Sequence, residues 1–141
     1  MIPPRSPYSL IQEDLWPNEW KILVACMLLN CTTRSAMEKV LPRLFSLYPD
    51  ATSMAHADHG HLSQVISRLG FGNRRASNLI KMSREYLGSN WEHARDLPGI
   101  GRYGAAAWEI FVLGVLPEDC PDDHALTHYW KWRQKHKGNN T

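Results

Sequence analysis

Apolar residues recur at helical spacing along most of the chain, and no stretch alternates between polar and apolar residues for long enough to predict a strand. The clearest stripe follows Asn18, which can cap a helix through its side chain. Its members fall at positions i, i+3, i+4, i+7 and i+8: Trp20, Leu23, Val24, Met27 and Leu28. This pattern predicts an all-α chain.

Further stripes predict five more helices joined by short connections. Their apolar positions are Val40, Leu41, Leu44, Phe45 and Tyr48; Leu62, Val65, Ile66 and Leu69; Ala76, Leu79, Ile80, Tyr86 and Leu87; Tyr103, Ala106, Ala107, Ile110 and Phe111; and Leu126, Tyr129 and Trp130. Pro49, Gly70 and Gly88 are expected to end the first three, and Asn73 to cap the third. Pro42 lies inside the first of these stripes, so that helix should be kinked or start late.

The length and composition fit one soluble globular domain over residues 1–141. A chain of 141 residues with 43% hydrophobic and 21% charged residues can bury a substantial core but not two. No apolar run approaches the roughly 20 residues that cross a bilayer, so no membrane association is expected. The start of the chain lacks the apolar core of a signal peptide, which predicts an intracellular protein, nuclear in a eukaryote.

The chain has three cysteines, Cys26, Cys31 and Cys120, and none are in CxxC spacing. They are interpreted as reduced thiols, because the count is odd and no pairing framework is visible. Three cysteines are too few for a four-cysteine iron–sulfur cluster, and no metal site is expected.

Charge is segregated along the chain although the net charge is only +2. Acidic residues gather near residues 13–19 and 118–123, and basic residues near 68–84 and 131–137. A chain with separated signs can present one basic face to nucleic acid. Ordinary solvated helix surface is the alternative interpretation.

The sequence Leu97-Pro98-Gly99-Ile100-Gly101 precedes the stripe that starts at Tyr103 and forms a candidate turn between two helices. Leu97 and Ile100 are expected to pack into the core, while Gly99 and Gly101 adopt backbone angles closed to other residues. Such a turn exposes N–H groups at a helix start, where a DNA phosphate can approach closely. A simple helix connector is the alternative interpretation.

Residues 95–103 resemble the hairpin of the helix-hairpin-helix DNA glycosylase superfamily. The likeness extends, in order, over most of the chain, to the family of thymine glycosylases that carry a methyl-CpG-binding domain, which this chain lacks. Its other segments are Pro3–Glu13, Trp20-Lys21, Leu29–Thr32, Leu69–Phe71, Gly99–Gly104 and Pro121–His124.

That resemblance implies a helix-hairpin-helix DNA glycosylase fold: a compact multi-helix domain with a DNA-binding cleft. It implies a monomer that acts on double-stranded DNA, flips out thymine or uracil opposite guanine, and hydrolyses the N-glycosidic bond to leave an abasic site. No cofactor is expected, apart from a monovalent cation that the hairpin could hold.

By the same resemblance, the catalytic carboxylate is one of two neighbours, Asp122 and Asp123. Its charge would stabilise the oxocarbenium-like sugar and it would orient or deprotonate the attacking water. Asp123 is favoured, because Leu126 three residues later should point into the core and turn that carboxylate toward the cleft. Asp122 would then cap the helix or support the catalytic carboxylate, and His124 would make a structural hydrogen bond or touch phosphate rather than carry a proton.

Bifunctional members of the superfamily carry a nucleophilic Lys two residues after the second hairpin glycine, where this chain has Tyr103. A phenol cannot form a Schiff base with the sugar, so the resemblance implies a monofunctional enzyme without lyase activity. Tyr103 would line the base pocket, and Gln12 would hydrogen-bond the flipped pyrimidine. Taken alone, either residue could be structural.

The resemblance also assigns DNA contacts. Phe71, between two glycines, would enter the base stack as a wedge, unless the loop folds onto the core. The residues implied to contact the DNA strand or its phosphates are Arg74, Arg75, Lys81, Leu97, Pro98, Gly99, Ile100, Gly101 and Arg102. Two positions depart from some relatives: Cys31 replaces an Arg that fills the gap left by the flipped nucleotide, and Ala125 replaces a Lys.

Three other functions stay open at this stage. The chain could remove another base, such as 5-hydroxymethyluracil, an alkylated purine, or adenine opposite oxidised guanine. It could be a catalytically silent module that uses the hairpin to clamp phosphate. It could also be a helical protein–protein scaffold, although no particular residue indicates one.

Overall fold

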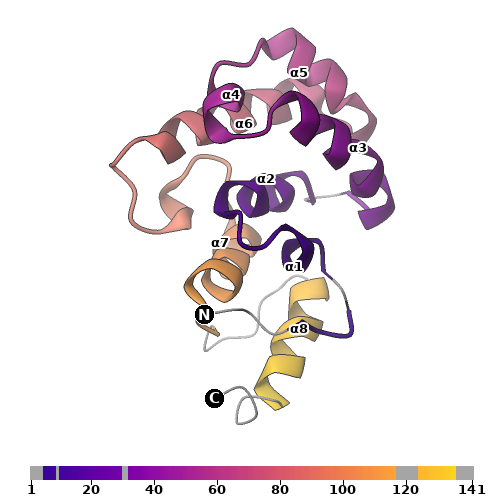
Figure 1. The fold of residues 1–141 in the computed structure, drawn as a ribbon, viewed down its shortest axis with the longest axis vertical. Helices are drawn as coiled ribbons and strands as arrows, with labels where there is room; N and C mark the ends of the chain where they lie inside the picture. The colour runs from indigo at the N-terminus through magenta and orange to yellow at the C-terminus, as the bar shows by residue number, and fades with distance from the viewer. Residues whose placement is uncertain (1–4, 9, 30–31, 117–123, 136–141) are drawn as a thin grey trace.

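The computed structural model describes residues 5–8, 10–29, 32–116 and 124–135, and all regular structure in them is helical (Figure 1). This confirms the predicted all-α class. The α-helices are α1 Ile11–Leu15, α2 Glu19–Leu29, α3 Arg34–Leu47, α4 Ala51–Ala55, α5 His59–Val65, α6 Gly72–Leu87, α7 Arg102–Trp108 and α8 His124–Lys135. Two 3₁₀ turns, Ser67–Leu69 and Ala94–Asp96, and a π-helical turn, Glu109–Leu113, complete the elements.

Helix α2 lies at the centre, with α3 to α6 above it in the view of Figure 1 and α1, α7 and α8 below. The predicted single stripe was too narrow, because Ile22, Ala25 and Cys26 on the other side of the helix are also buried. A helix that is apolar on all sides belongs between two layers, and α2 contributes to a core on each side. Asn18 caps it as expected, since its Oδ1 accepts from the Lys21 N–H at 2.9 Å.

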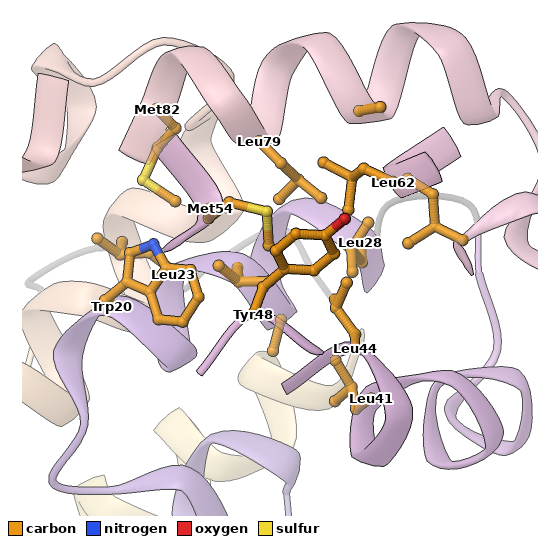
Figure 2. Close-up of a cluster of buried hydrophobic side chains, with 14 of the residues drawn as sticks. Trp20, Leu23, Leu28, Leu41, Leu44, Tyr48, Met54, Leu62, Leu79 and Met82 are labelled. Carbon is orange, nitrogen blue, oxygen red and sulfur yellow. The ribbon is translucent and has the colours of Figure 1, made fainter. Parts of the chain in front are cut away.

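The upper core is built on α2 to α6, and Ile11, Leu69, Ala94, Leu97, Ile100 and Trp108 join it (Figure 2). Its labelled members are Trp20, Leu23, Leu28, Leu41, Leu44, Tyr48, Met54, Leu62, Leu79 and Met82. The indole Nε1 of Trp20 donates to Ser83 Oγ at 3.0 Å, which satisfies its one polar atom inside the core. This layer holds α6 firmly against α4 and α5.

The lower core packs α8 against α1, α2 and α7 through Leu10, Ile22, Cys26, Ala107, Ile110, Phe111, Leu126 and Tyr129. Leu126 is fully buried, as the sequence predicted. Tyr103 packs partly against the same cluster. The cluster therefore joins the start of α8 to the helix that follows the hairpin.

Several elements differ from the predictions. Helix α3 starts at Arg34, earlier than its stripe, because Thr33 Oγ1 caps it by accepting from the Ala36 N–H at 3.2 Å. It runs through Pro42, so the prediction of a late start was wrong. Helix α4 was not predicted: it is only five residues long and begins at an Asp50 cap.

The third difference is at α6, which begins at Gly72 rather than after Asn73. Its N-cap residue is Phe71, and Asn73 lies in the first turn, where its Oδ1 accepts from Ser63 Oγ at 3.1 Å. Gly88 ends α6 as expected. Gly70 was expected to end a helix that includes Leu69, but α5 already ends at Val65, and Gly70 instead ends the 3₁₀ turn Ser67–Leu69. Within the described ranges, no helix is both long and apolar enough to span a bilayer.

Candidate nucleic-acid interface and base pocket

The hairpin at residues 97–101 is fixed from both sides. Leu97 and Ile100 are buried, at 2% and 9% exposure, which confirms that they pack the turn onto the core. Before the turn, Asp96 Oδ2 accepts from the backbone N–H groups of His93 at 3.1 Å and Glu92 at 3.2 Å. These bonds, the stronger effect coming from the His93 N–H, hold the pKa of the Asp96 carboxyl below its usual value. After the turn, α7 begins at Arg102.

The two hairpin glycines differ, and one expectation about them was wrong. Gly99 has φ +82°, and a Cβ built there would lie 2.7 Å from Met27 Cε. Gly101 has φ −93° and ψ −164°, extended backbone that any residue adopts, and no atom of the described residues lies within 4 Å of a Cβ built there. The fold therefore requires glycine at position 99, while position 101 is left open toward the outside.

Alanine at each glycine should separate folding from DNA binding. Gly99→Ala should lower the free energy of unfolding by about 1–3 kcal/mol, because alanine is strained at φ +82°, while the flexible end of the Met27 side chain can move aside. Gly101→Ala should leave the melting temperature within about 1 °C, yet weaken duplex binding if a phosphate lies against this backbone. Thermal melts and duplex titrations check both. Unchanged duplex affinity in Gly101→Ala would contradict a phosphate contact there.

Two adjoining pockets follow the hairpin and share Met27 and Gly99. The first has a volume of 280 Å³ and reaches from Gly99 across α6 to Phe71; its lining also includes Arg74, Arg75 and Asn78. The second has a volume of 360 Å³ and reaches from Gly99 to Tyr103 and Cys26. We call this pair of pockets the hairpin groove. It brings residues 71, 74 and 99–103, which the sequence singled out separately, onto one surface.

Tyr103 lines the second pocket of the groove, and Gln12, which is not among the lining residues, contacts it. Gln12 is 1% exposed, and its Nε2 donates to Tyr103 Oη and, at 3.5 Å, to Cys26 Sγ. The residues come from α1, α7 and α2, separated by as many as 91 positions. Cys26, which lines the second pocket, was noted in the sequence only as a reduced thiol. The structure thus places Tyr103 on the wall of the second pocket, and the buried Gln12 amide fixes its phenol by a hydrogen bond.

Phe71 lies at the other end of the groove and projects from the surface. It is 73% exposed, so the loop does not fold onto the core. Its backbone is left-handed, with φ 53° and ψ 37°, a conformation in which a bulky non-glycine residue is a strained outlier. Strain of this kind often marks a functional position.

The basic residues assigned to phosphate differ in their surroundings. Arg74, Lys81 and Arg102 are exposed, and Lys81 shares a pocket of 490 Å³ with Pro98 of the hairpin. Arg75 instead donates through Nη1 to Leu28 O at 3.0 Å and to Thr32 Oγ1 at 2.9 Å. It therefore ties α6 to the end of α2, a structural task that the sequence did not indicate.

Cys31, Asp122 and Asp123 lie outside the described residues. Helix α8 begins at His124, directly after Asp123, and its Leu126 is buried in the lower core together with Cys26. No group of three or more histidine, cysteine or acidic residues able to hold a metal occurs among the described residues.

Comparison with known proteins gives the class of protein. Residues 24–139 match the HhH-GPD superfamily of base excision DNA repair proteins, so the chain belongs to this superfamily, as the hairpin resemblance predicted. Its fold is that of a helix-hairpin-helix DNA glycosylase.

Individual relatives extend this finding. The chain is 38% identical over 131 residues to a methyl-CpG-binding domain protein 4-like protein of Arabidopsis thaliana, covering 93% of this chain and 29% of that protein. It is 31% identical over 111 residues to endonuclease III of a Synechocystis strain, covering 74% of this chain and 51% of that protein. A solved structure of a thermostable thymine-DNA glycosylase superposes with a TM-score of 0.64 at 25% identity, covering 70% of this chain and 49% of that one. The chain thus spans about half the length of these proteins or less.

Proposed function

We propose that this chain is a monofunctional DNA glycosylase that excises thymine or uracil opposite guanine. The observation that carries the proposal is the buried Gln12 amide against Tyr103 Oη at the end of the hairpin groove. A groove that grips one strand beside a polar pocket suits an enzyme that must take a base out of the duplex. The solved structure that superposes on this chain is named a thymine-DNA glycosylase, which supports the same substrate class.

In the proposed reaction, the hairpin holds a phosphate and Phe71 takes the space left in the base stack. The C1′–N1 bond breaks and its electron pair leaves with the pyrimidine. A water oxygen adds to C1′, and the water proton passes to the carboxylate of Asp123, whose charge has stabilised the cationic sugar. The packing of α8 on the cluster that holds Cys26 and Tyr103 supports a role for the residue just before that helix.

The absence of lyase activity is proposed from Tyr103. This position follows Gly101 by two residues, and its phenol accepts a hydrogen bond from Gln12 rather than offering an amine. Without an amine, no Schiff base with the opened sugar forms there, and the product is an intact strand with an abasic site.

A strand-cleavage assay tests the proposal. Labelled duplexes with G·T, G·U, A·U, G·5-hydroxymethyluracil and A·oxoguanine pairs are incubated with protein and split into portions with and without alkali. Breaks are expected only after alkali and most strongly for G·T and G·U. Breaks without alkali would overturn the monofunctional assignment. Salt-sensitive duplex binding without any breaks would indicate a silent DNA-binding module.

A further inference from the structure

Phe71 holds a backbone conformation that an aromatic residue does not favour. Gly70 has φ +81° and Phe71 has φ 53°, so two successive residues occupy the left-handed side of the backbone map. The Phe71 side chain is 73% exposed and therefore has little packing of its own to hold it there. A strained aromatic residue persists in such a place only when its surroundings fix the backbone.

The surroundings that fix it belong to α5. A Cβ on Gly72 would lie 2.9 Å from Ser63 Oγ and 3.0 Å from Ser63 O, so the backbone just after Phe71 rests directly on Ser63. Ser63 Oγ also donates to Asn73 Oδ1 at 3.1 Å. One turn away, His59 Nε2 lies 3.0 Å from Asn73 O and 3.0 Å from Ser77 Oγ.

The chemistry of these contacts gives His59 a definite role. A backbone carbonyl only accepts hydrogen bonds, so the Nε2 of His59 must carry the proton that it donates to Asn73 O. Asn73 and Ser77 are one helical turn apart, and so are Arg74 and Asn78, which line the hairpin groove. The face of α6 that contacts His59 is therefore adjacent to the face that lines the hairpin groove.

Helix α5 is itself well anchored. Leu62 and Val65 are buried in the upper core, and Asp58 Oδ2 caps the helix by accepting from the His61 N–H at 2.9 Å. Contacts from α5 thus transmit the rigidity of the core to the exposed loop. A side chain that must enter a base stack needs such support, because binding energy is lost when a loose loop is ordered.

We infer that His59 and Ser63 are positioning residues that hold Phe71 ready for insertion into DNA. This inference rests on the proposed function, in which Phe71 fills the space beside the flipped nucleotide. Neither residue is among those that line the groove, so their effect on DNA passes through the first turn of α6.

The test compares four variants of the whole chain. His59→Ala removes the bridge to Asn73 and Ser77, and His59→Gln keeps a donor of similar reach. His61→Ala is the matched control, because His61 lies on the same helix and its Nδ1 bonds Tyr48 Oη at 2.6 Å instead of α6. Phe71→Ala shows how far the mismatch preference and the fluorescence rise fall when the inserted side chain is removed. Each variant is melted thermally and titrated with a G·T duplex that carries 2-aminopurine beside the thymine, whose fluorescence rises when stacking is lost.

His59→Ala should lower the preference for mismatched over matched duplex by about threefold to tenfold, the range set by one hydrogen bond. The fluorescence rise should shrink with it, His59→Gln should restore most of both, and His61→Ala should match the unaltered protein. The inference is overturned if His59→Ala has the mismatch preference and fluorescence rise of the unaltered protein while Phe71→Ala loses both. Equal losses in His59→Ala, His59→Gln and His61→Ala would overturn it too. The alkali assay on the unaltered protein tests the proposed function separately, because the fluorescence readout does not require excision.

Discussion

Asp123→Asn should bind a G·T duplex as tightly as the unaltered protein and excise almost nothing. The amide keeps the size of the carboxylate but not its charge, so it neither stabilises a cationic sugar nor takes a proton from water. Groups that act in these ways typically contribute 10²–10⁴-fold, and we expect a loss of at least about 10³-fold in the single-turnover rate. Folding should be unaffected, because Asn and Asp are equally good at the start of a helix.

Asp122→Asn is the matched control for this change, since it makes the same substitution one residue earlier. It should retain clear excision. Both variants are measured under single-turnover conditions with a labelled G·T duplex, and their binding is measured in parallel at low and moderate salt. The reverse pattern, with Asp122→Asn inactive and Asp123→Asn active, would reassign the carboxylate. Near-normal rates in both variants would remove this segment from the chemistry.

The sequence predicted the parts of the fold that depend on local periodicity. Stripes at helical spacing gave the helices from α2 to α8 with the exception of α4, which is too short to show a period. The predicted apolar stripe of α2 left out Ile22 and Cys26, because the spacing of apolar residues does not reveal that a second layer of helices covers the other side of α2. The early start of α3 depends on a Thr33 cap outside the stripe.

The candidate site was predictable where the chemistry lies in consecutive residues. The hairpin packing of Leu97 and Ile100 follows from their flanking glycines and apolar side chains. The tie from Arg75 to Leu28 O and Thr32 Oγ1 was not predictable, because a basic residue on a helix looks the same whether it faces solvent or a carbonyl. Only the tertiary structure brings those partners together.

Glu19 is the residue whose importance the sequence concealed most. It appears as one of several acidic residues near the N-terminus, yet it links three helices. Its Oε1 accepts from Tyr86 Oη at 2.9 Å and its Oε2 from Trp108 Nε1 at 2.8 Å. Burial raises the pKa of the Tyr86 phenol, and the hydrogen bond to the Glu19 carboxylate raises it further. The phenol therefore stays protonated and remains a hydrogen-bond donor up to alkaline pH. Since Trp108 ends α7, Glu19 holds the helix that follows the hairpin against α2 and α6.

Glu19→Ala should lower the free energy of unfolding by about 2–4 kcal/mol, because two largely buried donors lose a charged acceptor. For a domain of this size, that corresponds to a fall in melting temperature of roughly 10 °C. Asp14→Asn is the control: Asp14 pairs with Arg5 at 2.9 Å on the surface, where such a bridge contributes less than about 1 kcal/mol. Urea unfolding of both variants gives the comparison. Equal stability in the two would mean that Tyr86 and Trp108 find water or other acceptors when Glu19 is removed, and that α7 is held by apolar packing alone.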